Sequence, residues 1–305
     1  MLKFGIPEYR LPREILQAEL EHILKLGVEI KTDTVLGKDL TLDDLSSQDY
    51  AAVFLAIGAQ QSKKLKLEGI ELNGVLWGLE FLKNINLGHD VQVEDRVLVI
   101  GGGNVAIDVA LTALRLGAKE VQLICLECRD EMPAHEWEIQ RALEENVILN
   151  CSWGPKKILG TDGRVSGIEL IRCTSVFDED GKFHPSFDET TTKSIETDMV
   201  ILAIGQTPDL SVLTPESLVN ITPEGLVQVK ENMTTGTPGI FAGGEVTSSP
   251  LSVVETIEMG KKAGCKTIYL LTGHGKKHKD ELKLNPDFVA NNFYEASKII
   301  LKNES

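Results

Sequence analysis

Six consecutive residues in the middle of the chain have the types and spacing of a phosphate-binding turn. They are Gly101, Gly102, Gly103, Asn104, Val105 and Ala106. This order fits the pattern G-x-G-x-x-G/A, in which the first glycine allows a tight turn and the second lets the backbone approach a pyrophosphate. The anion would meet free backbone N–H groups and the positive end of a helix dipole. The motif predicts a dinucleotide site; the alternative is a glycine-rich turn with a structural role only.

The elements around this motif strengthen the prediction. A short run rich in β-branched residues, 96–100, precedes the glycines, and residues 104–116 have one apolar face at helical spacing. Gly117 would end that helix, and 121–126 reads as the next strand. The sequence therefore predicts a strand–glycine turn–helix–strand unit.

The residue after the second strand normally discriminates NAD from NADP. Glu127 lies 21 residues beyond Ala106, where an acidic side chain would accept hydrogen bonds from the ribose 2′-hydroxyl. Arg129 and Arg141 are nearby and could instead pair with a 2′-phosphate. We expect NAD(H) to be preferred over NADP(H), with a solvated loop carboxylate as the alternative reading of Glu127.

Two other groups of reactive side chains are expected to be structural. Cys125 and Cys128 form a CxxC pattern, but no second CxxC accompanies it, and Cys125 falls on the expected buried strand. His135 and Glu136 open a predicted helix without a nucleophile or metal-ligand spacing beside them. We therefore predict no metal site and no catalytic acid–base pair.

The composition is that of a globular protein with 305 residues, of which 42% are hydrophobic and 25% charged. The formal net charge of −15 argues against nucleic acid or an anionic membrane as the main partner, because both require clustered Lys and Arg. Five irregularly spaced cysteines do not suggest a disulfide framework. Without an apolar stretch of spanning length or a signal peptide, we expect a cytoplasmic protein.

The rest of the chain alternates between helical and strand patterns. Helices are expected at 13–26, 41–45, 78–87, 134–145 and 252–271. Pro133 is expected in the first turn of the helix at 134–145. Strands are expected at 28–30, 51–57, 147–151, 199–204 and 240–242, and as two strands within 156–176 around the turn 161–164. Residues 178–192 read as a long exposed loop. Two strands end in Ala-Ile-Gly, at Gly58 and Gly205, which suggests two related nucleotide-binding lobes.

Several motifs, taken together and in order, identify a family. They are Gly5–Pro12, Ala56-Ile57-Gly58, the glycine motif at 101, Met132-Pro133 and Phe241–Gly244. This set resembles the small (beta) subunit of glutamate synthase and its relatives, which are FAD-dependent pyridine nucleotide oxidoreductases. The resemblance covers most of residues 1–272.

The resemblance implies an α/β fold in which a Rossmann-like NAD(P)-binding domain is inserted into an FAD-binding domain of the pyridine nucleotide-disulfide oxidoreductase type. The expected boundaries are 1–93 for the first FAD part, 94–205 for the NAD(P) domain, and 206–305 for the second FAD part with a tail. In such proteins Gly243, Gly244 and the acid after them approach the FAD, the following helix through Val253 and Val254 covers the flavin, and the segment Gly5–Pro12 passes beside it. No catalytic acid or base is implied, since hydride passes from nicotinamide to flavin.

Three departures from the family pattern bear on function. Family members usually carry Asp after Gly-Gly, whereas this chain has Glu245. Members that use NADPH have paired arginines where this chain has Leu126 and Glu127, which strengthens the expectation of NADH. The family's iron–sulfur cysteines and first FAD-binding glycine motif have no counterpart, so the sequence is expected to begin part-way through a domain with an incomplete FAD site.

The leading hypothesis is an NAD(P)H-dependent flavin oxidoreductase that feeds electrons to an iron–sulfur or glutamate synthase large-subunit-like partner. A non-catalytic NAD(H)-binding fragment or module is the alternative, and a non-redox NAD-sensing or scaffold protein is a third reading. A homo-oligomer or a neighbouring subunit could cover apolar surface left by a missing half-domain.

Overall fold

Two units divide the chain, and neither is one continuous stretch. In this computed structural model, residues 1–25, 27–48, 50–213, 219–248, 253–264, 268–270 and 288–290 are described. The first unit combines Met1–Leu11 with Ser62–Gln206, and the second combines Pro12–Gln61 with Thr207–Ser305. Strands β2 (Gln61–Ser62) and β11 (Gln206–Thr207) pair with each other where the chain passes between the units.

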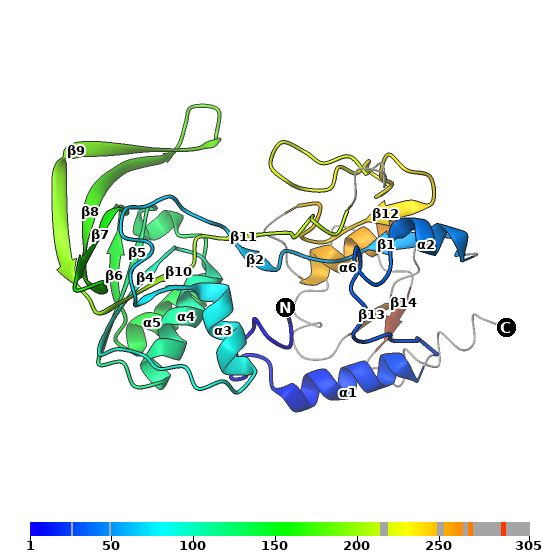
Figure 1. The fold of residues 1–305 in the computed structure, drawn as a ribbon, viewed down its shortest axis with the longest axis horizontal. Coiled ribbons are helices and arrows are strands. Elements are labelled where there is room, and N and C mark those ends of the chain that lie inside the picture. Colours follow the sequence, from blue (N-terminus) through cyan, green and yellow to red (C-terminus); the bar gives the residue numbers. More distant parts are fainter. Residues whose placement is uncertain are drawn as a thin grey trace. The chain divides into compact units, whose positions relative to one another are not determined.

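A five-stranded parallel sheet forms the centre of the first unit (Figure 1). Its strand order is β3 (Val75–Trp77), β10 (Met199–Leu202), β4 (Arg96–Ile100), β5 (Glu120–Cys125) and β6 (Ile148–Cys151). All four neighbouring pairs are parallel, so every strand ends at the same edge. In parallel α/β sheets, ligands bind outside that carboxyl edge.

Three helices cover one face of this sheet: α3 (Gly78–Asn86), α4 (Asn104–Arg115) and α5 (Glu136–Glu144). Helix α4 lies deepest, because eight of its 12 residues are buried. Its Ile107 and Leu111 pack with Val97 and Val99 of β4 in one apolar cluster. This helix is therefore held firmly by its burial as well as by its own hydrogen bonds.

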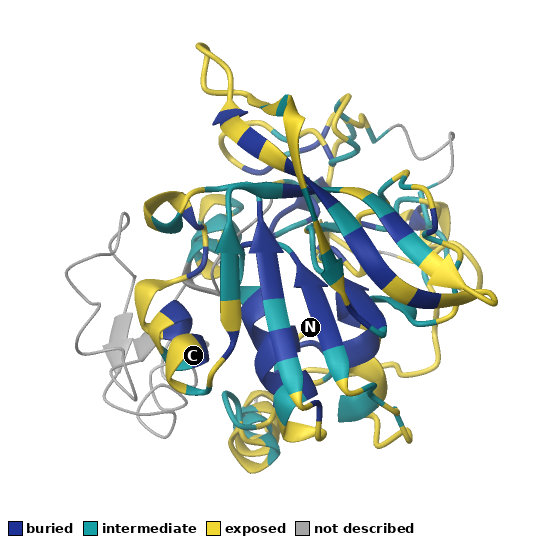
Figure 2. Ribbon diagram, turned by 90° about the vertical axis from the view of Figure 1, so that its left-hand side faces the viewer, coloured by how far each residue is buried: buried dark blue, intermediate teal, exposed yellow. Residues whose placement is uncertain are grey.

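A three-stranded antiparallel sheet covers the opposite face, with the order β7 (Trp153–Thr161), β8 (Arg164–Phe177) and β9 (Phe183–Glu196). Leu98 and Ile100 of β4 point to this side and pack with Ile168 and Leu170 of β8. Period-2 alternation thus buries β4 on both faces. Figure 2 shows the central strands buried along most of their length, whereas the long antiparallel hairpin carries many exposed residues.

The second unit is built around a parallel pair, β1 (Val53–Leu55) and β12 (Ile240–Ala242). Helices α1 (Arg13–Leu24), α2 (Leu42–Ser47) and α6 (Val253–Lys262) also belong to it, and the short strands β13 (Ile268–Leu270) and β14 (Phe288–Ala290) pair in parallel. Leu42, Leu55 and Val246 lie in its core. Thr41 caps α2 by a reciprocal pair of hydrogen bonds with Asp44, as the sequence of that turn suggests.

Most predicted elements are confirmed, with shifts of a few residues at their ends. The strand 96–100 is found as β4, and the turn 161–164 joins β7 to β8 with positive φ at Asp162 and Gly163. A primed turn of this kind suits the twist of a hairpin.

Four predictions of local structure are wrong. Residues 28–30 form no strand, since none of the described strands pairs with them, and the side chains of Val28 and Ile30 are exposed. Most of 178–192 belongs to strand β9 because β8 supplies a hydrogen-bonding edge for it. The helix expected over 252–271 ends at Lys262, and residues 268–270 form β13. Pro133 precedes α5 by three residues instead of lying in its first turn.

The described units also divide the chain elsewhere than the expected boundary at residue 94. Residues 62–93 lie with the first unit, because Val75–Trp77 pairs with β10 and α3 packs beside α4. Residues 1–11 also belong to that unit, where the Asn86 side chain donates a hydrogen bond to the Phe4 carbonyl oxygen at 2.9 Å. The tail beyond residue 264 lies outside the described residues except for β13 and β14.

Candidate nucleotide-binding site

The glycine turn lies between the end of β4 and the start of α4, as the motif predicts. Gly101 has φ 141°, and a β-carbon on it would lie 2.3 Å from the Ala203 carbonyl oxygen, so the turn requires glycine there. Gly103, the residue before the first helical residue, is different: a β-carbon there would meet no atom within 4 Å. Its missing side chain leaves open space in front of the helix N-terminus, which is what a bound pyrophosphate needs.

Glu127 lies beside the middle glycine of the turn. A β-carbon on Gly102 would meet Glu127 Oε2 at 2.8 Å, so the carboxylate reaches back over the turn from the end of β5. The Ser152 backbone N–H donates to the Glu127 carbonyl oxygen at 2.8 Å and fixes the backbone there. This carboxylate is therefore close to the backbone of the glycine turn.

The two arginines that could oppose Glu127 are both engaged with carboxylates. Arg129 donates to both Glu136 oxygens, at 2.7 and 3.0 Å. Arg141 pairs with Glu145 at 3.2 Å. A 2′-phosphate would have to compete with these partners for either guanidinium.

Asn104 has a positioning contact that the motif does not reveal. Its side-chain oxygen accepts a hydrogen bond from the His135 backbone N–H at 2.9 Å, and the Ala134 N–H donates to the Gly102 carbonyl oxygen at 3.1 Å. The segment from Met132 to His135 is thereby fixed onto the glycine turn. The Met132-Pro133 motif is the sequence signal for this segment, but its contact with the turn depends on non-local hydrogen bonds.

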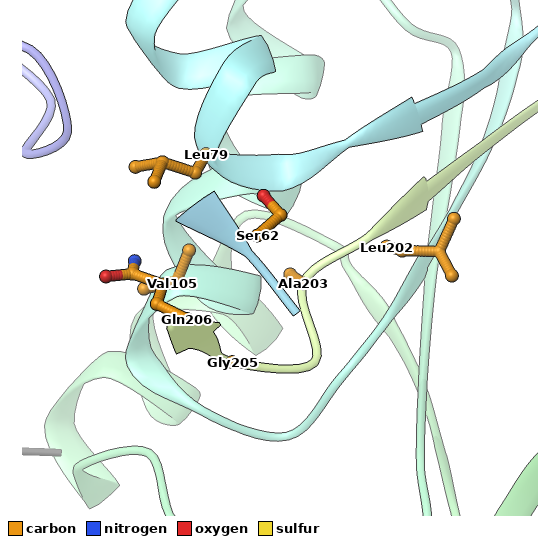
Figure 3. Close-up of a pocket in the computed structure, with 7 residues that line it drawn as sticks. All are labelled: Ser62, Leu79, Val105, Leu202, Ala203, Gly205 and Gln206. Atoms are coloured by element: carbon orange, nitrogen blue, oxygen red, sulfur yellow. The ribbon is translucent and has the colours of Figure 1, made fainter. Parts of the chain in front are cut away.

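A small pocket of about 210 Å³, its open mouth included, lies at the start of α4 and the end of β10. Figure 3 shows the side chains around it, which come from β2, α3, α4 and β10 together with the residues that follow β10. Val105 and Gly205, both predicted site residues, line it together with Ser62 and Gln206. The Ser62 hydroxyl donates to Glu80 Oε2 at 2.5 Å. Ser62 and Gln206 were missed because nothing in their local sequence marks them.

In the second unit, the predicted residues gather at the carboxyl edge of its parallel pair. Gly58 follows β1, and the Gly243 N–H after β12 donates to the Leu55 carbonyl oxygen at 3.1 Å. A β-carbon on Gly243 would meet Phe54 Cζ at 2.7 Å and Met259 Cβ at 3.1 Å, so packing with α6 also explains this glycine. Gly244 has φ 77°, and Glu245 follows it half-buried.

The Gly5–Pro12 motif includes Tyr9 and Arg10, which bind α4 and α5 of the first unit. The Tyr9 hydroxyl donates to Asp108 Oδ1 at 3.0 Å, and Arg10 Nη1 donates to Asp108 Oδ2 at 2.6 Å. Arg10 Nη2 also pairs with Glu138 Oε1. Burial raises the pKa of Asp108 in spite of Arg10, and burial raises the pKa of Glu138 to about 7.

The two cysteines of the CxxC pattern have different surroundings. Cys125 is buried, Cys128 is exposed, and the four described cysteines are all free thiols. Burial, with Cys151 nearby, raises the pKa of Cys125, which makes it a poor nucleophile. The described residues contain no group of three His, Cys, Asp or Glu side chains placed to hold a metal ion. In the same part of the chain, no helix is both long and apolar enough to cross a membrane.

Comparison with known proteins decides the family. Residues 7–260 match the sequence profile of the pyridine nucleotide-disulphide oxidoreductases. The chain belongs to the pyridine nucleotide-disulphide oxidoreductase family. The expected α/β fold of this family is confirmed.

Individual relatives confirm the resemblance seen in the motifs. The chain is 38% identical to the beta subunit of the NADP(+)-dependent formate dehydrogenase of Moorella thermoacetica, over 86% of this chain and 38% of that protein. It is 34% identical to the small chain of glutamate synthase [NADPH] of Escherichia coli K12, over 86% of this chain and 59% of that one. The chain thus spans about 40–60% of the length of these curated relatives.

Among solved structures, FprA of Mycobacterium tuberculosis in complex with NADPH has a similar fold. It superposes with a TM-score of 0.69 at 16% identity, covering 98% of this chain and 79% of that one. At this identity, the similarity concerns the fold alone.

The residues present fit a pyridine dinucleotide in the first unit. Gly103 leaves open space at the N-terminus of α4, and Gly101 closes the turn against Ala203. In the second unit, Gly58 and the turn 243–245 follow β1 and β12 and would fit part of an FAD site, while its described residues contain no glycine turn that leads from a strand into a helix as in the first unit. The side chains of Val253 and Val254 lie outside the description, so their expected place over a flavin is untested.

Proposed function

We propose that this chain is the NADH-oxidising part of a flavin-dependent oxidoreductase. The observation that carries the proposal is the glycine turn, in which Gly101 is forced by contact with Ala203 while Gly103 leaves open space in front of α4. Two glycines with such different surroundings, at this spacing, suit a turn that admits a pyrophosphate. The turn would bind the dinucleotide through backbone N–H groups of Asn104 and Val105.

The preference for NADH over NADPH rests on Glu127. Its carboxylate lies beside Gly102, where it would accept hydrogen bonds from a ribose 2′-hydroxyl and repel a 2′-phosphate. The engagement of Arg129 and Arg141 with glutamates supports the same choice. The names of two relatives include NADP(+) or NADPH. In its proposed preference for NADH, this chain would differ from them.

FAD would be bound at the carboxyl edge of β1 and β12 by Gly58, Gly243, Gly244 and Glu245. When both cofactors are present, the nicotinamide donates a hydride and the flavin accepts it. The chain's own residues would orient the dinucleotide and exclude water, and no side chain of the described site is needed as an acid or base. In this division of roles, the second unit (12–61 and 207–305) would serve FAD, and the first unit (1–11 and 62–206) would serve NADH.

A redox partner would receive the electrons that this chemistry supplies. The relatives are named as a beta subunit and a small chain, so we propose an iron–sulfur or large-subunit-like partner for this chain as well. The free thiols suit a reducing compartment such as the cytoplasm. A homo-oligomer is compatible with the exposed apolar side chains of α1, among them Ile15 and Ile23.

A second candidate is an NAD(H)-binding module that does not retain FAD by itself. The observation in its favour is that the described part of the second unit has two separate two-stranded parallel sheets and one Gly-Gly turn, while the first unit has a five-stranded parallel sheet.

Absorption spectra of the purified chain, before and after incubation with FAD, distinguish the two candidates. A flavin spectrum that NADH bleaches without oxygen supports the enzyme. A chain that binds NADH but stays colourless after incubation supports the module.

Cofactor choice is tested by titrating NADH and NADPH into wild type and Glu127→Arg. We expect the ratio of their dissociation constants to shift toward NADPH by about tenfold or more, because an arginine can pair with the 2′-phosphate. Glu131→Arg on the neighbouring 3-10 helix (Arg129–Glu131) makes the same charge change and should leave the ratio near its wild-type value. A wild-type preference for NADPH would refute the assignment of Glu127.

A further inference from the structure

Arg10 connects two helices that both begin beside the glycine turn. Its guanidinium contacts Asp108 on α4 and Glu138 on α5 at the same time. The side chains of these acids are only 8% and 3% exposed, so the guanidinium neutralises charge that water barely reaches. Buried carboxylates require such a partner, because a bare charge in the interior is costly.

Among the described residues around Asp108 and Glu138, Arg10 is the cation that contacts both acids directly. Tyr9 donates a hydrogen bond to Asp108, and the Arg115 guanidinium lies over the Tyr9 ring at 3.7 Å. Arg115 also pairs with Glu145 at 2.6 Å, and Arg141 lies over the same ring at 5.1 Å. Arg10 itself lies 5.6 Å from the Trp137 ring centroid, on the helix that carries Glu138.

Asp108 and Glu138 lie near the N-terminal ends of α4 and α5, the ends that lie beside the glycine turn. Asp108 is the fifth residue of α4, which begins directly after Gly103, and Glu138 is the third residue of α5. The residues before α5 are hydrogen-bonded to the turn, through Ala134 to Gly102 and His135 to Asn104. A change in the spacing of α4 and α5 would therefore strain the turn directly.

We propose that Arg10 is a positioning residue for nucleotide binding, which sets the spacing of α4 and α5 so that the glycine turn and the segment 132–135 form one phosphate-binding surface. The inference rests on the proposed nucleotide site. It assigns a role to residues 1–11, which lie about 90 residues before the motif that they support. Without Arg10, the two acids would repel each other whenever both are ionised, and the helix ends would separate.

The test is NADH affinity of the full chain, measured by fluorescence titration. Arg10→Met should weaken binding by about tenfold, equivalent to about 1.4 kcal/mol. Arg10→Lys retains the charge and should recover most of the loss. Arg164→Met is the matched control, since Arg164 is a surface residue of the same unit, paired with Glu94 at 2.8 Å, and should leave affinity unchanged.

A pH series separates positioning from a general loss of structure. In Arg10→Met, affinity should fall further as pH rises from 6 to 9, because the second carboxyl loses its proton and repulsion grows. Adding Glu138→Gln to that variant removes one charge and should abolish the pH dependence. If Arg10→Met alone does not fold, NADH affinity is measured in the double variant instead.

The outcomes are distinguishable from those of the proposed function. If wild type does not bind NADH, the nucleotide site itself is wrong. If wild type binds but Arg10→Met, or the double variant where the single one does not fold, binds equally well at every pH, the role of Arg10 is wrong.

Discussion

The carboxylate of Glu127 lies so close to Gly102 that a β-carbon on this glycine would be 2.8 Å from Glu127 Oε2. The middle position of the motif is written as any residue, yet in this chain it too is restricted. The restriction comes from the residue thought to select the cofactor. In the proposed site, the turn that would bind the phosphates and the carboxylate that would select the ribose therefore lie side by side.

Gly102→Ala is expected to destabilise the first unit. The added methyl would also lie 3.0 Å from Cys125 Cβ and 3.3 Å from Pro133 Cδ, so neighbours on three sides must shift. Overpacking of this kind costs about 1–3 kcal/mol. Denaturant unfolding measures the loss, and an unchanged midpoint would contradict the close packing of Gly102 against Cys125 and Pro133.

Gly103→Ala is expected to leave the stability of the first unit almost unchanged and to weaken NADH binding. The φ of −91° suits alanine and no atom lies near the new β-carbon, so unfolding free energy should stay within about 1 kcal/mol of wild type. NADH affinity should fall by at least about tenfold, because the methyl occupies space that the pyrophosphate requires. Titration of NADH into both glycine variants checks this, and unaltered binding by Gly103→Ala would argue against a phosphate at the turn.

The stability of the first unit should decrease as pH rises through the neutral range. Burial raises the pKa of Glu138 from 4.5 to about 7, so the folded protein holds a proton that the unfolded chain has released. Its contribution is therefore complete below pH 4.5 and is lost by pH 7, at a slope of at most about 1.4 kcal/mol per pH unit. Burial raises the pKa of Asp108 as well, which acts in the same direction.

Glu138→Gln provides the comparison for this pH dependence. The variant cannot release a proton at this position, so its stability relative to wild type should improve between pH 4.5 and pH 7. Unfolding curves at four pH values would show the trend. Parallel curves for the two proteins would mean that Glu138 is ionised throughout.

The two cysteines of the CxxC pattern should react at different rates. Cys128 is exposed, whereas Cys125 is buried and its pKa is raised by that burial. Iodoacetamide at pH 8 should alkylate Cys128 more than about tenfold faster, as mass spectrometry of timed digests would show. Equal rates, or zinc in the purified protein, would revive a redox or metal role for the pair.

The sequence predicted those parts of the fold in which pattern and burial agree. The run Arg96–Ile100, the glycines and the apolar face of α4 are read within one window, and the structure places them as expected. Strand β9 was predicted as a loop because most of its residues are polar and exposed, so it lacks the alternation that marks a half-buried strand. Val28–Ile30 has strand-like residues, but no strand in the described part of the chain pairs with it, and β-branched composition alone does not create an edge to pair with.

Contacts between distant segments could not be read in the same way. The sequence of Val75–Trp77 indicates a strand only weakly. The strand forms because β10, more than 120 residues later in the chain, pairs with it. The sequence places Asp108 in the predicted helix after the glycine motif but does not indicate its partners. The structure shows that Arg10 and Tyr9 bind it. The pocket residues Ser62 and Gln206 likewise come together through pairing between β2 and β11.

The contact between Gly101 and Ala203 also bears on the order in which the protein can fold during synthesis. Strand β10 lies between β3 and β4 in the sheet although it follows β6 along the chain. A ribosome that has released residues up to about 190 would have exposed the whole glycine motif, but not the strand that closes its turn. Nucleotide capture should therefore come late in translation, and a nascent chain stalled before residue 199 should not respond to NADH.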